Sequence, residues 1–467
     1  MSHENQFILA VDFGSTYTKV AAIDINREEI TQIARSLTTV DTNIMQGYHS
    51  AIDKLGPQFK KNQGLYRKVA CSSAAGGLRM ITIGLIPELT VAAAKNAALG
   101  AGAKVQRVYA GALNNSELSE IQSLNPDIIL LCGGTDGGND KVVSDNAKTI
   151  ALSDINSNFV FAGNKVVVDY VISKFSAHGK KIEVAENVMP EIGVLNIESA
   201  QSKIRNIFLE NIVRAKGIES TSTDIDSVLM PTPVAILNAT KLIADGTSNQ
   251  GGWGGSLVVD LGGATTDVHS VSDGEPTRIN VTQKGLPEPY LKRTVEGDIG
   301  MRYCIEGIID GDRLGIVAKH CGFEKKKIEQ YCSLVKNNLA HLPVSSEEVK
   351  IERSLAKVAV ETAIQRHAGT LKSIYTPMGE VFVQSGKDLS NVSVIIGTGG
   401  AIVESDLPSE ILKSISFNPA EPLSLRPQNP EYFLDKDYVL FAIGLLNEID
   451  PDIAFRVAEK SVTRLQQ

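Results

Sequence analysis

The sequence predicts an α/β protein made of two lobes of like fold, with a further α/β domain inserted into the first lobe. Two observations predict this architecture. A strand, an acidic glycine turn and a returning strand occur near residue 12 and again near residue 260. Between them, residues 80–190 alternate short apolar runs with helical segments, a pattern typical of βαβ units around a parallel sheet.

These patterns divide the chain into four segments. Residues 1–79 are expected to begin the first lobe and residues 191–255 to complete it. Residues 80–190 are expected to form the inserted domain, and residues 256–467 the second lobe. A chain of 467 residues has room for about two to four domains of ordinary size.

The first lobe is expected to begin with a meander of buried strands, because polar turns separate short apolar runs. The expected strands cover residues 7–11, 19–25, 30–37 and 65–73, and residues 41–60 are expected to form a helix. After the inserted domain the lobe is expected to end with helices at residues 199–215 and 234–244. The second of these follows Pro231-Thr232-Pro233.

The inserted domain is expected to alternate strands with helices. Strands are expected at residues 105–110, 127–132, 158–162 and 181–186, and helices at residues 89–101, 141–152 and 165–176. The inserted domain also contains a glycine-rich run, residues 133–138, which follows an expected strand and precedes an expected helix. Such a run either binds an anion or forms a structural turn or protein contact, and the residues leave both readings open.

The second lobe is expected to start after a turn-rich stretch, residues 246–255, which holds five glycines. Residues 256–273 repeat the strand–turn–strand pattern of the N-terminus. Helices are expected to dominate residues 299–369, and a strand at residues 392–396 ends in Gly397-Thr398-Gly399-Gly400. Two helices are expected to close the chain, at residues 438–447 and 451–465.

The repeated strand–turn–strand unit is the feature that points to function. Asp12 and Asp260 lie 248 positions apart, and each follows a buried strand and precedes a glycine turn with hydroxyl residues. This spacing is too long for a solenoid repeat and indicates two related lobes. Glycine turns let backbone N–H groups approach an anion, and hydroxyls and a lysine can bind phosphate oxygens. The expected phosphate-binding residues are Gly14, Ser15, Thr16, Lys19, Gly262, Gly263, Thr265 and Thr266.

The aspartates of the two units require a cation, because a bare carboxylate repels phosphate. Magnesium binds through one or two carboxylates together with water and phosphate oxygens, so Asp12 and Asp260 are the expected metal ligands. Asp12, Asp260 and Asp267 are the expected catalytic residues, since one of them can orient the attacking water. Gly397, Thr398, Gly399 and Gly400 are expected to let adenine and ribose approach the backbone.

Composition excludes several classes of function. The net charge of −8 opposes general nucleic-acid binding, which depends on clustered Lys and Arg. Five scattered cysteines without a CxxC pair predict reduced thiols in a cytoplasmic protein, although an iron–sulfur cluster shared by two chains stays open. No signal peptide and no membrane span are expected.

The motifs resemble those of the actin/Hsp70/sugar-kinase superfamily. Residues 8–20 are similar to its first phosphate motif, residues 257–271 to its second, and residues 394–403 to its adenosine motif. The resemblance implies an actin-like ATPase fold of duplicated ribonuclease H-like lobes that hold ATP or ADP and Mg²⁺ between them. It covers most of the chain outside the inserted domain.

Within that superfamily the sequence is most similar to the MutL/GlmL group, the accessory proteins of adenosylcobalamin-dependent glutamate mutase and related aminomutases. Residues 72–78, the run ILLCGGTDGG and the run VVDLGGATTDVHSV carry this resemblance. It implies an ATP-dependent reactivating chaperone that binds mutase subunits and exchanges damaged for intact cobalamin. A small-molecule kinase and an actin-like scaffold on the same fold are the alternatives, and homo-oligomerisation stays open.

One position departs from the superfamily pattern. Hsp70 proteins carry a glutamate directly before the Pro-Thr pair of the first interlobe connection, where it helps to hold metal and water. In this sequence Met230 stands there. The substitution implies a slow ATPase whose hydrolysis drives a conformational change.

Overall fold

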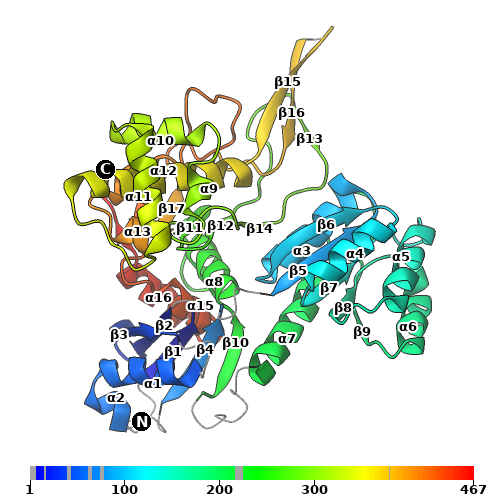
Figure 1. Cartoon of the computed structure of the whole chain (residues 1–467), viewed down its shortest axis with the longest axis horizontal. Helices are drawn as coiled ribbons and strands as arrows, with labels where there is room; N and C mark the ends of the chain where they lie inside the picture. Colours follow the sequence, from blue (N-terminus) through cyan, green and yellow to red (C-terminus); the bar gives the residue numbers. More distant parts are fainter. Residues whose placement is uncertain are drawn as a thin grey trace. The chain divides into compact units, whose positions relative to one another are not determined.

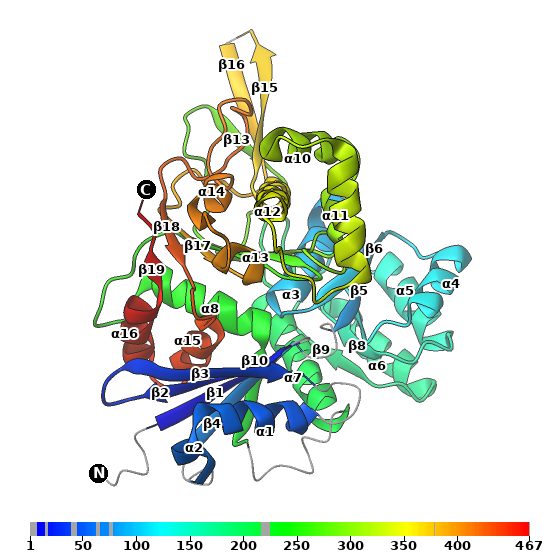
Figure 2. The ribbon, with the colours of Figure 1, turned by 60° about the vertical axis from the view of Figure 1, so that its left-hand side comes forward.

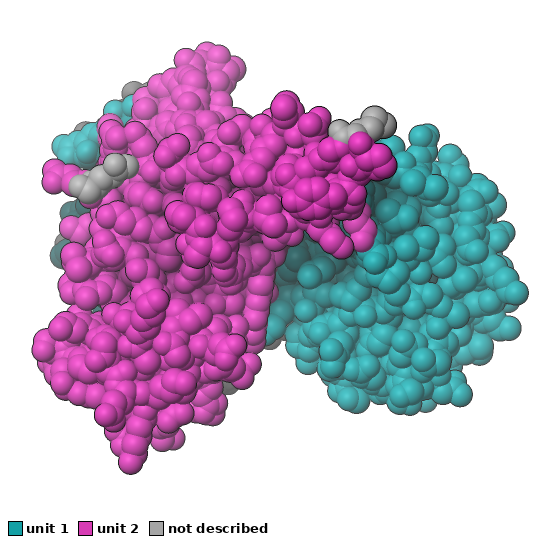
Figure 3. Space-filling view, turned by 90° about the horizontal axis from the view of Figure 1, so that it is seen from above, with its two compact units in different colours: residues 1–236, 285–289 teal, residues 237–284, 290–467 magenta. Residues whose placement is uncertain are grey.

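The computed structural model describes residues 7–14, 17–38, 44–61, 66–73, 78–215, 225–377 and 379–466. It divides into two compact units, which Figure 3 shows in different colours. Unit 1 comprises residues 1–236 and 285–289, and unit 2 comprises residues 237–284 and 290–467.

Unit 1 contains a five-stranded mixed sheet in the order β10-β4-β1-β2-β3 (Figure 1). The first three strands form an antiparallel meander, and β4 and β10 run parallel to β1. Helix α1 packs on β2 and β3 and ends before Gly56, whose φ of 117° no longer fits a helix. The elements are β1 (Phe7–Phe13), β2 (Tyr17–Asp24), β3 (Glu29–Leu37), α1 (Ile44–Leu55), α2 (Pro57–Lys61), β4 (Arg67–Ser72) and β10 (Ser227–Pro231).

Unit 2 contains a sheet with the same strand order, followed by one short extra strand: β14-β12-β11-β17-β18-β19. Its first three strands again form an antiparallel meander, and β17 and β18 run parallel to β11. The strands are β11 (Ser256–Leu261), β12 (Thr266–Val271), β14 (Leu291–Glu296), β17 (Val394–Thr398), β18 (Glu431–Leu434) and β19 (Thr463–Arg464). Two sheets of ribonuclease H-like order confirm the predicted duplication and the actin-like ATPase fold class.

The inserted α/β region of unit 1 holds a second five-stranded sheet, in the order β6-β5-β7-β8-β9, and all its strands are parallel. This order is that of flavodoxin-like doubly wound folds. The elements are β5 (Arg79–Gly84), η3 (Pro87–Val91), α3 (Ala92–Gly100), β6 (Lys104–Ala110), α4 (Asn115–Leu124), β7 (Ile128–Leu131), α5 (Lys141–Leu152), β8 (Asn158–Phe161), η4 (Lys165–Val167), α6 (Val168–Ala177) and β9 (Ile182–Val184). Helix α7 (Glu198–Ala215) follows this region in the chain.

Side chains of this parallel sheet are buried on both faces. Ile128 and Leu130 of β7 belong to the core cluster that contains the alanines of α3, whereas Ile129 and Leu131 pack with α5 and α6. Because successive side chains of a strand point to opposite faces, a strand covered on both sides must be apolar throughout. This explains the uninterrupted apolar run that β7 shows in the sequence.

The helices of unit 2 include three that pack on its sheet, with α12 against β11, β12 and β14, and α13 and α14 against β17. They comprise α8 (Thr232–Asp245, which begins in unit 1), α9 (Ile305–Ile308), α10 (Arg313–Cys321), α11 (Lys325–Asn337), α12 (Ser346–His367), α13 (Gly400–Val403), α14 (Pro408–Lys413), α15 (Leu440–Asn447) and α16 (Pro451–Ser461). In the part of the chain that the structure describes, no helix is long and apolar enough to cross a membrane.

A separate three-stranded sheet extends from unit 2, in the order β13-β16-β15. Its strands are β13 (Val281–Lys284), β15 (Thr370–Thr376) and β16 (Gly379–Ser385). Figures 1 and 2 show β15 and β16 reaching away from α10 and α12. The sequence pattern did not predict this sheet.

Most of the elements expected from the sequence lie near the expected residues. The elements β5, α4, β10, β14 and β18 were not predicted, and the expected helix at residues 451–465 ends at Ser461, before the short strand β19. The predicted helix at residues 41–60 is split into α1 and α2, and its first three residues lie outside the described residues. The predicted helix at residues 89–101 begins as the π-helical turn η3. The domain boundaries near residues 80, 190 and 255 stay predictions.

Candidate functional site

The first candidate site element is the β1–β2 hairpin of unit 1. The Gly14 N–H donates to the carbonyl oxygen of Tyr17 at 3.1 Å and closes the turn. A β-carbon on Gly14 would lie 2.5 Å from that oxygen, so this position requires glycine. Ser15 and Thr16, the predicted hydroxyl donors, lie outside the described residues.

Asp12 occupies the end of β1 and is buried, with 2% of its surface exposed. Its Oδ1 accepts a hydrogen bond of 2.6 Å from Thr232 Oγ1 and a longer one, 3.6 Å, from Cys71 Sγ. Its Oδ2 lies 3.5 Å from Lys19 Nζ. A buried carboxylate needs such partners because desolvation is otherwise unfavourable. The predicted Asp12 and Lys19 therefore lie together, and the carboxylate is held by two side chains that were not predicted as site residues.

Strand register explains how these groups meet. Lys19 is directly opposite Asp12 on β2, and Cys71 is opposite Asp12 on β4. Burial, and secondarily the negative charge of Asp12, raises the pKa of the Cys71 thiol well above its usual value. Cys71 is thus a neutral thiol at the site and not a thiolate.

The β10–α8 junction supplies Thr232. β10 runs parallel to β4 and pairs Met230 with Cys71, and α8 begins two residues later at Thr232. Met230 itself is buried, with 2% exposed. The side chain at this position is therefore apolar and packed, where the superfamily pattern has a glutamate.

The second candidate element is the β11–β12 hairpin of unit 2, which repeats the geometry of the first. The Gly262 N–H donates to the Thr265 carbonyl oxygen at 3.0 Å, and Asp260 faces Asp267 across the strands. Within the described residues, the N–H groups of Gly263, Ala264 and Thr265 have no intramolecular acceptor. Unpaired amides at a glycine turn are suited to binding an anion.

The two hairpins differ at one equivalent position. Lys19 lies opposite Asp12 in the first, whereas Asp267 lies opposite Asp260 in the second. Asp267 Oδ1 accepts from Arg293 Nη2 at 2.6 Å and from Arg293 Nε at 2.9 Å, and its Oδ2 accepts from Thr265 Oγ1. The Arg293 side chain is 5% exposed. The catalytic assignment of Asp267 stays a prediction, and the geometry gives its charge a buried partner.

The remaining hydroxyl of this hairpin has a structural partner. Thr266 is buried, and its Oγ1 donates to the carbonyl oxygen of Ile299. The side chain therefore fixes the start of β12 to the segment before α9. Thr265, in contrast, is only half-buried, so its hydroxyl is the one of this hairpin that solvent can reach.

The predicted adenosine segment, residues 397–400, joins β17 to α13. Gly399 has φ of 92°, and a β-carbon there would lie 2.3 Å from the carbonyl oxygen of Leu261. A side chain on Gly397 would meet Ile402 and Leu412 at 2.8 Å. Glycine at position 399 therefore lets this segment approach the end of β11, and glycine at position 397 lets β17 pack against α13 and α14.

Thr398 leads to a buried carboxylate that sequence reasoning did not find. Its Oγ1 donates to Asp435 Oδ2 at 3.0 Å, and Asp435 also accepts from the N–H groups of Val439 and Leu440. Asp435 is 1% exposed. Asp435 lies five residues before α15, outside the N-cap position, so the sequence carries no capping signal that could have drawn attention to it.

The described residues contain no cluster of three or more His, Cys, Asp or Glu side chains that could bind a metal ion by themselves. Magnesium does not need such a cluster, because it keeps several waters and binds through one or two carboxylates plus phosphates. Asp12 fits this requirement, since a buried carboxylate next to a phosphate-type turn can hold a hydrated ion. Asp260 offers a carboxylate at the equivalent place in unit 2.

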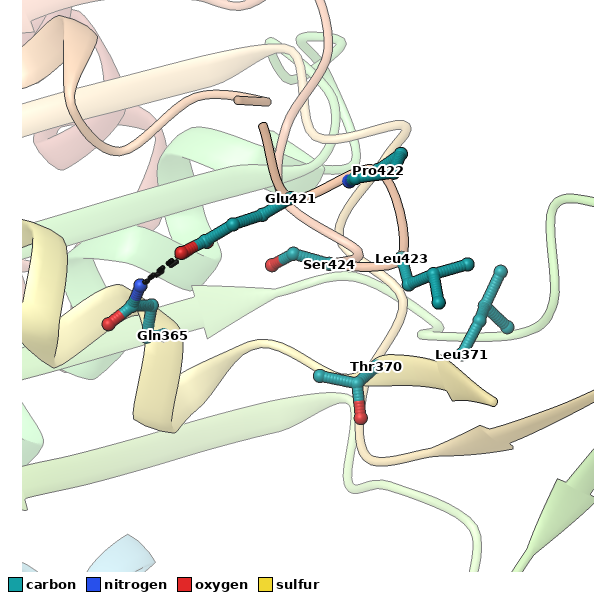
Figure 4. A pocket seen from close by; sticks show the side chains of 7 residues that line it. All are labelled: Gln365, Thr370, Leu371, Glu421, Pro422, Leu423 and Ser424. Atoms are coloured by element: carbon teal, nitrogen blue, oxygen red, sulfur yellow. Dashed lines mark hydrogen bonds between the residues drawn. The ribbon is translucent and has the colours of Figure 1, made fainter. Parts of the chain in front are cut away.

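Two pockets are lined by residues other than those of these turns. One, of about 490 Å³, is in unit 2 beside the strap at residues 421–424, where Gln365 Nε2 donates to Glu421 (Figure 4). The other, of about 510 Å³, borders the glycine-rich run of the inserted region. There Asp136 accepts from the Lys165 N–H and from Asn187 Nδ2. The Asp136 carboxylate would repel a bound anion, and its hydrogen bonds join the glycine-rich run to neighbouring loops. Both observations favour a structural turn over an anion site.

Comparison with known proteins relates the chain to a family. Residues 8–462 match the family model described as MutL protein. The chain is 48% identical over 458 residues to Protein MutL of Clostridium tetanomorphum, covering 98% of this chain and 99% of that protein.

Likeness to solved structures is weaker. A nucleotide-free acetone carboxylase has a TM-score of 0.41 at 11% identity, covering 94% of this chain and 69% of that chain. A glycerol dehydratase reactivase has a TM-score of 0.34 at 10% identity, covering 95% and 99%. Scores of this size assign no function.

Proposed function

The chain belongs to the MutL protein family, and from this membership we propose that it is an ATP-dependent reactivating chaperone for an adenosylcobalamin-dependent mutase. The family resemblance predicted from the motifs is thereby confirmed. The proposed client is glutamate mutase or a related aminomutase, and the proposed action is exchange of damaged for intact cobalamin.

The observation that carries the ATP part of the proposal is the duplicated hairpin. Each copy places an aspartate at the end of a buried strand, directly before a turn closed by a glycine N–H. Unpaired amides at residues 263–265 are suited to phosphate oxygens, and Lys19 supplies positive charge at the other hairpin. Asp12 and Asp260 would hold Mg²⁺, which would offset the charge of the phosphates.

Slow turnover is part of the proposal. Fast hydrolysis needs a polar group to orient water, and the buried side chain of Met230 offers none at its position. Thr232 and Cys71 keep Asp12 in a fixed orientation without adding a base. Such a site favours a long-lived nucleotide state, which suits a conformational switch better than metabolic flux.

Reactivation can be measured directly. A client mutase is first sought by co-purification with this protein and is then inactivated by turnover. Its activity is followed after addition of the chain, Mg-ATP and fresh adenosylcobalamin. We expect activity to return, together with release of the damaged corrinoid, and the Asp12→Ala variant to restore none. ATP-dependent phosphorylation of a small acceptor without reactivation would instead identify a kinase.

A further inference from the structure

The turn of the β11–β12 hairpin, residues 262–265, is hydrogen-bonded to a segment that lies more than 30 residues later in the chain. The N–H of Met301 donates to the Gly262 carbonyl oxygen at 3.0 Å, and the N–H of Arg302 donates to that of Gly263 at 2.8 Å. A β-carbon on Gly300 would lie 2.5 Å from the Ala264 carbonyl carbon. Residues 300–303 therefore fit directly against the turn and use its carbonyl groups, leaving its amides for other partners.

This contact brings an arginine side chain to the turn. A β-carbon on Gly263 would lie 3.5 Å from both Cβ and Cγ of Arg302. The Arg302 Nη1 donates to the Met301 carbonyl oxygen and to Glu352 Oε1, each at 2.7 Å. Within the described residues its Nε and Nη2 have no partner. Part of the guanidinium group is thus positioned by the protein while other N–H donors remain available.

The charge pattern of the hairpin gives this arginine a role. In the first hairpin Lys19 faces Asp12, but in the second the equivalent residue is Asp267. The nearby Arg293 binds the Asp267 carboxylate through two nitrogens. A turn that binds phosphate beside two aspartates needs added positive charge, and Arg302 can provide it as a planar group with several N–H donors.

Glu352 explains how the guanidinium keeps its orientation. This α12 residue is 8% exposed, and its Oε2 accepts from Tyr331 Oη of α11 at 2.5 Å. Burial and the charge of Glu352 raise the pKa of Tyr331, so its hydroxyl stays a donor. Tyr331, Glu352 and Arg302 form a chain of hydrogen bonds that leads from α11 to the turn.

We propose that Arg302 is a phosphate-binding residue of the second turn and that Glu352 is its positioning residue. The proposal rests on the proposed ATP function and names a residue of that same site. Nη1 stays on Glu352, while Nε and Nη2 donate to phosphate oxygens held by the amides of residues 263–265. The chain of hydrogen bonds then couples the bound nucleotide to the packing of α11 and α12.

The test is isothermal titration of the full chain with Mg-ATP. We expect Arg302→Gln to weaken binding about 10–100-fold, because hydrogen bonds to a charged group are the strong ones. Arg302→Lys should recover at least part of the loss. The matched control is Arg353→Gln, which removes an arginine of α12 that pairs with Asp406 at the surface, and it should bind as the wild type does.

A structural role for Arg302 predicts a different pattern. If the loss came only from disturbing the buried cluster, Tyr331→Phe would weaken Mg-ATP binding as much as Arg302→Gln does, and the proposal would be overturned. We expect Tyr331→Phe to remain within about 3-fold of the wild type, because Arg302 keeps its contact with Glu352, and Glu352→Gln to weaken binding by less than Arg302→Gln does, because Arg302 keeps its charge but loses its charged anchor. Wild-type affinity in Arg302→Gln would also overturn it. Failure of the wild type to bind Mg-ATP would instead refute the proposed function.

Discussion

Thr232 donates a hydrogen bond of 2.6 Å to Asp12 across 220 positions of sequence. Asp12 ends the first strand of unit 1, and Thr232 begins the helix that follows the last strand of the same sheet. The bond fixes the carboxylate plane, because the Oδ1 atom cannot turn without losing a buried donor. The orientation of the Asp12 carboxylate thus depends on the β10–α8 junction, which has the sequence Pro231-Thr232-Pro233.

Replacing Thr232 by valine is expected to weaken Mg-ATP binding about 5–20-fold. Valine keeps the shape but leaves a buried Asp12 oxygen with only the distant Cys71 thiol as donor, and an unsatisfied buried acceptor costs roughly 1–3 kcal/mol. Thr232→Ser keeps the hydroxyl and should bind nearly as the wild type does. Titration calorimetry of both variants checks this, and equal affinity of the two would show that the hydrogen bond has no role.

Asp12→Ala and Asp260→Ala are each expected to lower the affinity for Mg-ATP by at least about 10-fold. Each carboxylate stands at the same place in its hairpin, and loss of a magnesium ligand removes a contact that water replaces poorly. Affinity measured with excess EDTA is expected to differ much less between wild type and variants. Unchanged Mg-ATP affinity in both variants would refute the site.

Arg293→Gln is expected to destabilise the protein by about 3 kcal/mol or more. Its side chain is 5% exposed and that of Asp267 is 14% exposed, so removal of the cation leaves a mostly buried carboxylate. The double variant Arg293→Gln, Asp267→Asn should recover much of this loss, because no unpaired charge remains. Denaturant unfolding of the single and double variants measures the difference, and an Arg293→Gln midpoint equal to that of the wild type would contradict it.

The sequence predicts those parts of the site that are local in the chain. The strand, aspartate, glycine turn and returning strand are contiguous, so the hairpins at Asp12 and Asp260 could be found from pattern alone. Their repetition also predicted two lobes of like fold, and the two sheets share one strand order. The glycine requirement at Gly14 and Gly399 follows the same logic, since each permits a close backbone approach.

The partners of these residues come from register between distant strands and could not be predicted in the same way. Cys71 meets Asp12 only because β4 pairs with β1, and Arg293 meets Asp267 only because β14 pairs with β12. Arg302 lies in a loop without a motif. The sheet of β13, β15 and β16 was not predicted because most residues of its strands are exposed or half-buried. Such strands lack the continuous apolar run that marks a buried strand in a sequence.

Acidification is expected to destabilise the fold through two buried histidines. Burial lowers the pKa of His269 to about 3, and burial lowers that of His367 well below its usual value. Both stay neutral in the folded chain, whereas in the unfolded chain they bind protons below about pH 6.5. Stability is therefore fully present above that pH and falls on acidification, by about 1.4 kcal/mol per pH unit for each histidine.

His269→Leu provides the check on this pH dependence. Among the residues that the structure describes, neither ring nitrogen of His269 has a hydrogen-bond partner, so leucine removes the titration without breaking a polar contact there. Unfolding by denaturant at pH 7.5, 6.5 and 5.5 should show a shallower loss of stability in the variant. His367→Leu also removes contacts to Thr294 and Ser270, so it should lower stability at every pH. Parallel curves for wild type and His269→Leu would exclude His269 as a source.

Gly399→Ala is expected to destabilise unit 2 and to abolish tight binding of adenosine nucleotides. At φ of 92° and ψ of 146° the backbone lies in a region that is nearly restricted to glycine, which costs a non-glycine residue about 1–3 kcal/mol. The added β-carbon would also meet the Leu261 carbonyl oxygen at 2.3 Å, so β17 must move away from β11.

Gly111→Ala is the matched control, because its φ is 80° but nothing lies within 4 Å of the added carbon. We expect the control to lose only about 1 kcal/mol of stability in denaturant unfolding and to keep its ATP affinity. Equal losses in the two variants would mean that backbone strain, and not the packing of residues 397–400 on β11, accounts for the effect.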